Sequence, residues 1–218
     1  MLKKLLICPY FGDFPPWMGQ FIENAKEIKK YGYDILIDTD LQGFKKRVKR
    51  VLDIDCPVVW GEPKVWDYRA CLGVLYKDEI ADYDFYGHCD FDMVFGNLNT
   101  FFPDEFYKGL DIHSNHHSYM CGCFSLYRNR AEVREVFKTV PNWKQYLTER
   151  QPNGWVEQAF SRGVELSGLN YKYTYEQGDP YQLNPNLELK DGALFQDGIE
   201  IPIYHFRISK KWPLTLIK

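Results

Sequence analysis

The sequence has no long apolar run and no excess of positive charge. Its first apolar stretch, LLIC, supplies only about four residues before Pro9, too few for a signal-peptide core or a membrane span. We therefore expect a first buried strand there and a cytoplasmic protein. The formal net charge of −3 disfavours general binding to nucleic acid, so no nucleic-acid partner is expected.

Repeats, low-complexity segments and flexible linkers are also lacking, which favours a single domain over residues 1–218. Cysteine is present, with six residues, but no export signal accompanies it, so we expect reduced thiols. Aromatic residues are abundant, with 16 Tyr, 15 Phe and 6 Trp. They fit a large core and an aromatic-lined pocket equally well.

Apolar runs and helical periodicities alternate along the first ninety residues. This alternation predicts a parallel α/β sheet that binds ligands at the carboxyl ends of its strands. The second half is less regular and is expected to add antiparallel strands, giving one mixed α/β domain. Expected strands cover 2–8, 33–40, 57–60, 83–90, 120–129 and 171–177, expected helices cover 17–31, 43–54, 64–80, 130–140 and 155–162, and a hairpin over 193–206 turns at Asp197 and Gly198.

Two aspartates, Asp90 and Asp92, follow the apolar run DFYGHC. Alternate side chains of an extended chain share a face, so both carboxylates can point at one cation. Mg²⁺ and Mn²⁺ prefer oxygen ligands, and Mg²⁺ is often held by one or two carboxylates together with substrate phosphates. A metal site for a diphosphate is therefore one interpretation, and a surface turn that contains two aspartates is the other.

Several motifs in order resemble a family of small bacterial glycosyltransferase-like proteins with the GT-A fold, the DUF6625 type. They are PYFGDFPPW, ILIDTD, KVWDYR, YDFYGHCDFDMVFGNL and GCFSLYRN, with weaker matches at WVEQAF and IYHF. The resemblance implies a GT-A-like domain with a mixed, mainly parallel central sheet flanked by helices. It also implies a nucleotide-sugar-dependent transferase, with a nucleotide-binding half over 1–98 and an acceptor and sugar half over 99–218.

The resemblance assigns the metal ligands. Asp92 is expected to contact the metal most directly, and Asp90 to reach the metal or the ribose. His205 matches a late histidine that completes the metal site in several GT-A families. Imidazole suits Mn²⁺ better than Mg²⁺. The alternative for His205 is a partly buried side chain near a sheet edge.

The nucleotide is expected at the ends of the first two strands. Such folds seat the base beside Pro9, Tyr10 and Phe11, where Tyr10 or Phe11 can stack on uracil. Asp38 and Thr39 end the second strand and are expected to bond the base or ribose. Ordinary loop packing is the alternative for all of these residues.

Basic and acidic residues in KVWDYR and near the carboxyl terminus are expected around the diphosphate. The resemblance places Lys64, Asp67 and Arg69 near the diphosphate and sugar, although Lys64 and Asp67 also form an ordinary i, i+3 helix pair. Lys210 and Lys211 can clamp the departing diphosphate. A solvated basic tail is the alternative for them.

The acceptor side is expected to use residues of the second half. Glu157 resembles an acidic residue below the sugar site in many GT-A enzymes, where it acts as general base, stabilises the sugar cation or holds the acceptor. An exposed helix glutamate is the alternative. His116 and His117 are candidates to line the sugar or acceptor site, and Gly122 permits close approach.

A zinc site is the competing interpretation of HSNHHSYMCGC. His113, Cys121 and Cys123 add possible ligands to the two histidines above. The Cys-x-Cys spacing is tighter than usual for zinc, however, and a strand there would make Cys123 a core residue.

The resemblance thus implies a transferase that moves sugar from a nucleotide diphosphate, most simply UDP, to a glycan or lipid-linked glycan with Mn²⁺ or Mg²⁺. Bacterial surface polysaccharide is the acceptor class by family analogy. A metal-dependent phosphohydrolase and a non-catalytic nucleotide-sugar-binding module are the alternatives. The basic segment 44–54 is either a membrane contact at the inner face or a solvated helix face.

Overall fold

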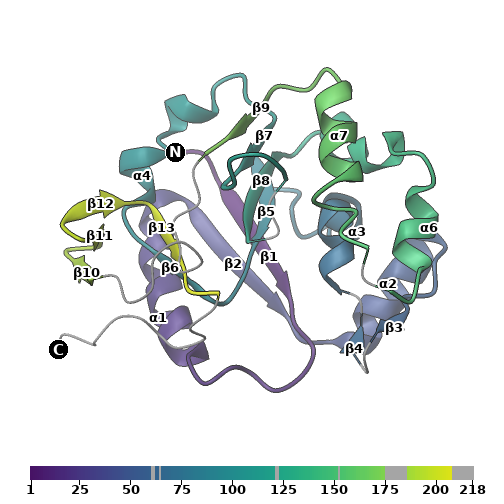
Figure 1. The fold of residues 1–218 in the computed structure, drawn as a ribbon, viewed down its shortest axis with the longest axis horizontal. Helices are drawn as coiled ribbons and strands as arrows, with labels where there is room; N and C mark the ends of the chain where they lie inside the picture. Colours follow the sequence, from purple (N-terminus) through teal and green to yellow (C-terminus); the bar gives the residue numbers. More distant parts are fainter. Residues whose placement is uncertain (60–61, 64, 121–122, 152, 175–185, 208–218) are drawn as a thin grey trace.

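The computed structural model contains a twisted central sheet with helices on both faces (Figure 1). The sheet runs through the middle of the molecule, and a smaller group of strands projects at one side. The structure describes residues 1–59, 62–63, 65–120, 123–151, 153–174 and 186–207.

The central sheet has six strands in the order β2-β1-β5-β8-β7-β9. Strand β1 pairs in parallel with β2 on one side and with β5 on the other, so Leu6 lies between Ile35 and Gly87. Strand β8 is antiparallel to both β5 and β7, whereas β9 is parallel to β7. The prediction of a mixed, mainly parallel sheet is confirmed. The bounds are β1 Lys4–Pro9, β2 Tyr33–Asp38, β5 Phe85–Cys89, β7 Ile112–Ser114, β8 Phe124–Arg128 and β9 Tyr171–Tyr173.

Both faces of β1 are buried because its side chains alternate between two cores. Leu5 and Ile7 pack with helix α2 (Leu41–Leu52) on one face, and Leu6 and Cys8 pack with helix α1 (Met18–Ile28) on the other. This explains the continuous apolar run in the sequence. Further helical elements are η1 Lys29–Tyr31, α4 Leu98–Phe101, η3 Asp104–Tyr107, α5 Ala131–Arg134, η4 Val136–Thr139, α6 Trp143–Thr148 and α7 Ala159–Leu166.

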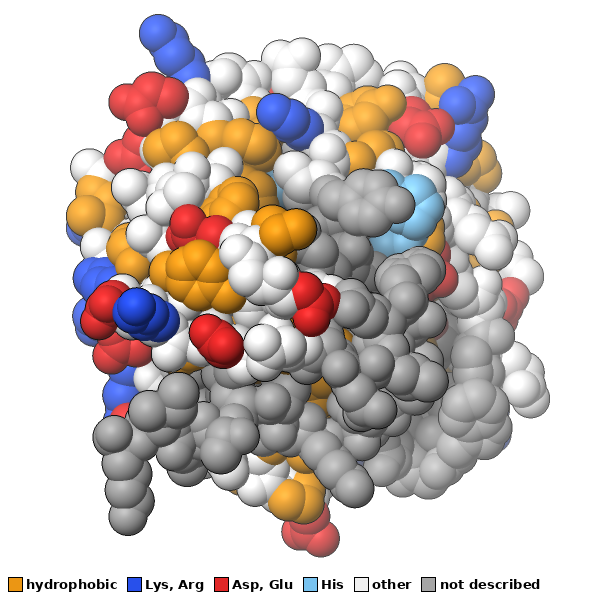
Figure 2. Space-filling model, turned by 60° about the vertical axis from the view of Figure 1, so that its left-hand side comes forward, with side chains coloured by type: hydrophobic (Ala, Val, Ile, Leu, Met, Phe, Trp, Pro, Cys, Tyr) orange, Lys and Arg blue, Asp and Glu red, His pale blue; other side chains and the backbone are white. Residues whose placement is uncertain are grey.

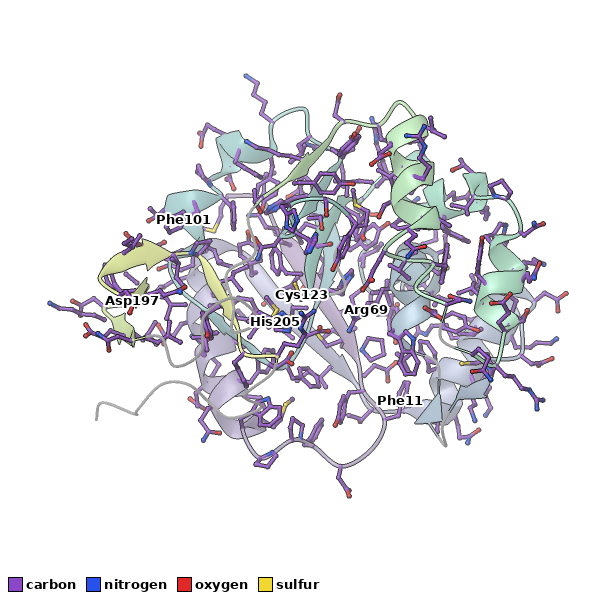
Figure 3. The ribbon with its side chains drawn as sticks, viewed as in Figure 1. Phe11, Arg69, Phe101, Cys123, Asp197 and His205 are labelled. Carbon is purple, nitrogen blue, oxygen red and sulfur yellow. The ribbon has the colours of Figure 1, made fainter. Side chains whose placement is uncertain are left out.

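The projecting strands belong to the chain after residue 186 and carry the predicted hairpin. Strands β10 (Leu187–Lys190), β11 (Ala193–Gln196) and β12 (Ile199–Ile201) form an antiparallel sheet. Asp197 and Gly198 have φ of 50° and 80°, the left-handed pair that a tight two-residue turn needs. The expected hairpin turn is confirmed, and Figure 3 places Asp197 at the outer edge of the molecule.

Several expected elements differ in the structure: the helix expected over 130–140 is split into α5 and η4, and the helix expected over 155–162 begins only at Ala159. In the described part of the segment 57–60, β3 (Val58–Val59) pairs with β4 (Glu62–Pro63) in a short hairpin and with no strand of the central sheet. Pro57 begins this segment and Pro63 lies in β4, and proline cannot donate to a central ladder. The expected helix over 64–80 is a 3₁₀-helix, η2 (Val65–Cys71), followed by a single turn of α-helix, α3 (Leu72–Leu75).

The surface, the helices and the thiols give three further observations. Acidic, basic and hydrophobic side chains are interspersed on the face drawn in Figure 2. Within the described residues, no helix has the length and apolar content needed to cross a bilayer. All five cysteines of the described part of the chain are free thiols.

Acid is expected to destabilise the protein through His113, which lies fully buried among aromatic rings. Its Nε2 lies 2.9 Å from the Thr174 hydroxyl, and burial, with a smaller contribution from Lys172, lowers its pKa to about 3. An unfolded histidine has a pKa of about 6.5, so the unfolded chain takes up the proton first as pH falls. We expect the free energy of unfolding to drop by about 2 kcal/mol between about pH 7.5 and pH 5.

Chemical denaturation of wild type and His113→Gln at several pH values tests this expectation. The variant should be less stable at neutral pH, because it loses the buried contacts, and should show a flatter pH dependence. Equal pH dependence in the two proteins would contradict the assignment to His113.

Candidate functional site

The D-F-D turn, residues 90–92, directly follows β5 and is held through its backbone from three directions. The Asp90 amide donates to the Cys123 carbonyl (2.8 Å), and the Phe206 amide donates to the Asp92 carbonyl (2.9 Å). The indole of Trp17 donates to the Phe91 carbonyl (3.0 Å). The turn is therefore held by the residue before β8, by the residue before α1 and by the residue after β13 (Ile203–His205).

Strand β6 (Met93–Phe95) continues from this turn and is held on both edges. One edge pairs with β13, where His205 lies opposite Met93. At the other edge the buried Asn24 side chain of α1 takes the place of a neighbouring strand: its amide donates to the Phe95 carbonyl (2.8 Å), and its oxygen accepts from the Phe95 amide (2.7 Å). The pairing of β6 with β13 brings a residue from position 205 beside the turn.

Three side chains converge at this point. One ligand atom from each of Asp90, Asp92 and His205 lies within 4.8 Å of the other two. His205 Nε2 is 3.3 Å from Asp92 Oδ1, and both side chains are buried. Figure 3 shows His205 near the middle of the molecule. Among the described residues this is the group of His, Cys, Asp and Glu with the geometry of a metal site.

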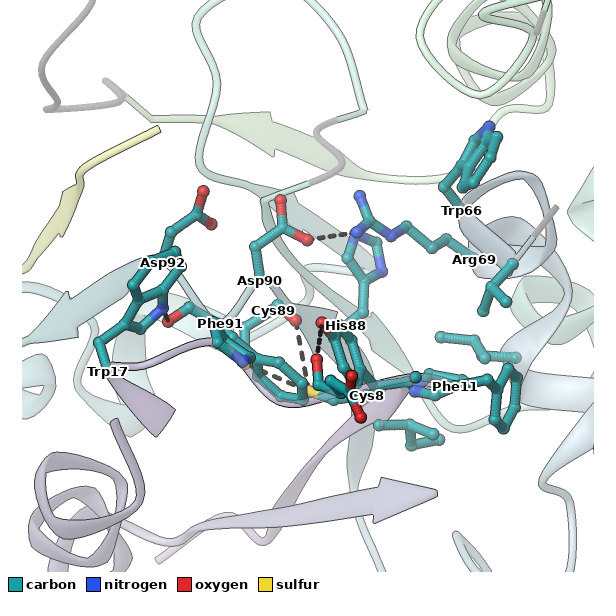
Figure 4. A pocket seen from close by; sticks show the side chains of 18 residues that line it. Cys8, Phe11, Trp17, Trp66, Arg69, His88, Cys89, Asp90, Phe91 and Asp92 are labelled. Atoms are coloured by element: carbon teal, nitrogen blue, oxygen red, sulfur yellow. Dashed lines mark hydrogen bonds and ion pairs between the residues drawn. The ribbon is translucent and has the colours of Figure 1, made fainter. Parts of the chain in front are cut away.

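Asp90 also forms an ion pair with Arg69 of η2 (Figure 4). The two side chains are 26% and 25% exposed, so the pair is partly shielded from solvent. Arg69 and Asp90 were separate expectations for the diphosphate and the metal, and the structure brings them into direct contact.

A cavity of about 600 Å³ opens beside these groups, at the carboxyl ends of β1 and β5. This is the edge at which open α/β sheets bind ligands. The volume lies within the usual range for small-molecule sites. Its walls combine aromatic rings, two thiols and the two acids of the turn. The lining residues are Ile7, Cys8, Pro9, Tyr10, Phe11, Gly12, Asp13, Pro15, Trp17, Val65, Trp66, Arg69, Leu72, His88, Cys89, Asp90, Phe91 and Asp92.

The aromatic side chains of the cavity differ in how closely they pack against other aromatic rings. Tyr10 stacks on Phe14 with ring centroids 5.6 Å apart, and Phe11 packs on Phe44 at 5.2 Å. Trp66 lines the cavity half-buried, and within the described part of the chain its ring stacks on no other ring and its indole N–H has no hydrogen-bond partner. Trp66 is thus the ring most open to a ligand (Figure 4).

The structure places Asp38 and Thr39 outside the cavity lining. One carboxylate oxygen of Asp38 accepts from the Tyr76 hydroxyl (2.6 Å) and the other from the Asp40 amide (3.0 Å), while Thr39 is exposed. Asp67 is 1% exposed and lies within η2, where its carbonyl accepts from the Trp155 indole (3.1 Å). A nucleotide role for these residues stays a prediction.

The residues expected at the acceptor side do not line the cavity either. Glu157 is exposed in the turn before α7. His116 is buried and stacks on Tyr119 at 3.5 Å and on His117 at 4.4 Å. Their roles stay predictions. Lys64, Gly122, Lys210 and Lys211, together with Cys121 of the zinc interpretation, lie outside the described residues.

Sequence reasoning missed four residues of this site: Trp17, Asn24, Trp66 and His88. His88 is 1% exposed and lines the cavity. The position of Trp66 between Lys64 and Arg69 was a usable signal. Asn24 and Trp17 act through backbone atoms of the turn and of β6, and such contacts leave no spacing pattern in a sequence.

A search of solved structures finds a crystal structure of a glycosyltransferase involved in the glycosylation of the major capsid of PBCV-1. The two chains share 14% identity with a TM-score of 0.50, and the match covers 84% of this chain and 85% of the other. At this identity the likeness shows the fold, which is GT-A-like as expected. A second structure, A197 from STIV, has 12% identity and a TM-score of 0.38 over 80% of this chain and 82% of that one.

Curated proteins give no significant match to this chain. A family model described as "Family of unknown function (DUF6625)" matches residues 6–182. Since this match spans most of the chain, the protein belongs to the DUF6625 family.

Proposed function

We propose that the protein is a metal-dependent glycosyltransferase that moves a sugar from a nucleotide diphosphate, UDP in the first instance, to a glycan acceptor. The observation that carries this proposal is the convergence of Asp90, Asp92 and His205 within 4.8 Å at the edge of the cavity. The GT-A-like fold supports it, because a cavity at the carboxyl ends of the strands suits a nucleotide.

The donor set fits a divalent cation. Two carboxylates and one imidazole suit Mn²⁺, and they suit Mg²⁺ less well because imidazole is a poorer ligand for it. Two acids this close repel one another, and a bound cation would relieve that repulsion. When bound, the ion would supply charge to neutralise a diphosphate leaving group.

The other cavity residues suit the remaining parts of a nucleotide sugar. The Arg69 guanidinium can donate two parallel hydrogen bonds to phosphate oxygens. Trp66 offers a ring face for stacking, and Tyr10 and Phe11, just after β1, line the same cavity. Lys210 and Lys211 are further candidates for the phosphates, and Glu157, His116, His117 and Gly122 for the sugar and acceptor.

We also propose a class of acceptor and a location for the protein in the cell. A glycan or lipid-linked glycan of a bacterial surface polysaccharide follows from the family analogy alone. A lipid-linked acceptor would suit contact between the basic helix α2 and anionic lipid at the inner face of the membrane, since Lys46, Lys49 and Arg50 are exposed.

A turnover assay with UDP-sugars, Mn²⁺ and candidate glycan acceptors tests the proposal. Sugar transfer with release of UDP would support it, and the anomeric form of the product would distinguish retention from inversion. Release of inorganic phosphate would instead favour a phosphohydrolase. Binding without turnover would favour a non-catalytic binding module.

Removal of the Trp66 ring is expected to weaken nucleotide binding. Stacking of one base on an aromatic side chain contributes about 1–3 kcal/mol, so Trp66→Ala should raise the Kd for UDP by about ten-fold or more. Trp66→Phe should recover most of the affinity, because it restores a ring face. Calorimetry provides the measurement, and a wild-type Kd in Trp66→Ala with an unchanged melting temperature would exclude the stacking role.

A further inference from the structure

Arg69 forms an ion pair with the Asp90 carboxylate, which the proposed metal site also needs as a ligand. Its guanidinium pairs with Asp90 Oδ1, on the same side chain that converges with Asp92 and His205. A guanidinium and a divalent cation at one carboxylate repel each other, so the Arg69 pair and full metal ligation by Asp90 compete.

We propose that Arg69 is an exchangeable counter-ion of Asp90, which leaves the carboxylate and binds the diphosphate when nucleotide and metal enter together. This inference rests on the proposed function. Its consequence is positive coupling: the nucleotide diphosphate removes the competitor of the metal, and the metal displaces Arg69 toward the phosphates. By linkage each ligand must then raise the affinity for the other by the same factor.

The chemistry of the pair suits such an exchange. A guanidinium fork matches carboxylate and phosphate equally well, so Arg69 can leave one partner and find an equivalent one. Both side chains line the cavity and are about one quarter exposed, which leaves room for movement. Asp92 and His205, at 8% and 5% exposure, are more enclosed and stay as the fixed part of the site.

The backbone that carries Arg69 is anchored, and its side chain is one quarter exposed. Trp155 donates its indole N–H to the Asp67 carbonyl (3.1 Å), and Tyr68 and Cys71 are fully buried. In a 3₁₀-helix residues three apart point the same way, so Trp66 and Arg69 share the cavity side of η2. The exchange therefore needs a change of side-chain torsions and no movement of the helix.

The alternative role for Arg69 is that of a fixed organiser, which holds Asp90 in the orientation that the metal requires. The two roles predict opposite changes in metal affinity when Arg69 is replaced. Removal of a competitor strengthens metal binding in the absence of nucleotide, whereas removal of an organiser weakens it.

The test measures Mn²⁺ affinity by electron paramagnetic resonance of the free ion, without nucleotide and then with saturating UDP. We expect Arg69→Gln to bind Mn²⁺ about ten-fold more tightly than wild type without UDP, within the usual range of coupling factors. UDP should raise Mn²⁺ affinity in both proteins, because the diphosphate would itself contact the metal, but by a clearly smaller factor in Arg69→Gln than in wild type. Arg69→Lys, which keeps the charge but loses the fork, should fall between them.

Arg162→Gln is the matched control, because it removes one positive charge from an exposed pair with Glu165 on α7. It should leave both affinities at wild-type values, and melting temperatures of all variants should agree with wild type. Unchanged or weaker Mn²⁺ binding in Arg69→Gln, beside normal wild-type binding, would overturn the exchange alone. Failure of both proteins to bind Mn²⁺ with or without UDP would overturn the proposed metal site and the exchange with it.

Discussion

Asp92→Ala should abolish Mn²⁺-dependent binding of UDP, with a loss of affinity of about a hundred-fold or more. The Asp92 side chain is 8% exposed and its Oδ1 lies 3.3 Å from His205 Nε2. Loss of outer partners of a metal site already costs about 10–100-fold in metal affinity, and loss of a direct ligand should cost at least as much. Calorimetric titration of UDP with and without Mn²⁺ measures the effect.

Two further variants separate the metal role of Asp92 from its structural role. Asp92→Asn keeps the shape and an oxygen near His205 but removes the charge, and it should also lose most of the metal-dependent affinity. Asp13→Ala removes an exposed acid of the same cavity that is not part of the converging group, and it should have a small effect. Mn²⁺-dependent binding of UDP by Asp92→Ala at the wild-type level would show that Asp92 is not a metal ligand.

Asn24→Leu should lower the free energy of unfolding by about 2–4 kcal/mol. The substitution keeps a similar volume but leaves both backbone polar groups of Phe95 without the side-chain partner that now satisfies them. Each unsatisfied buried group costs about 1–3 kcal/mol. Because β6 begins at the residue after Asp92, Mn²⁺ affinity should fall as well.

Urea denaturation of Asn24→Leu and Gln20→Leu measures this effect. Gln20 is an amide on the same helix that is only partly buried, so its replacement should change stability by less than about 0.5 kcal/mol. A stability loss in Asn24→Leu no larger than in Gln20→Leu would show that the paired hydrogen bonds do not hold β6.

Structural features that depend on a few neighbouring residues were predictable from the sequence. The apolar run of β1 indicates burial on both faces, and Asp197-Gly198 indicates a hairpin turn, because their signals lie within a few neighbouring residues. Gly32 ends the first helical segment in a left-handed conformation (φ 82°), as expected for a glycine there. The parallel order of the first strands follows from their alternation with helices.

Features that depend on distant contacts were not predictable from spacing. The segment 57–60 has strand composition, yet Pro57 within it and Pro63 of its hairpin partner disfavour a place in a central sheet. His205 meets Asp92 only because β13 pairs with β6, and the resemblance to a family, not the spacing, indicated it. The ion pair of Arg69 with Asp90 joins two elements whose relative placement no local pattern fixes.

The most direct test of the central claim is calorimetric binding of a panel of UDP- and GDP-sugars to the wild-type protein, with and without Mn²⁺. The account predicts that one nucleotide class binds, with UDP-sugars expected, and that binding strengthens when Mn²⁺ is present. Absence of binding by every nucleotide sugar in the presence of Mn²⁺ would contradict it, and would leave Asp90, Asp92 and His205 as a phosphohydrolase site or a structural cluster.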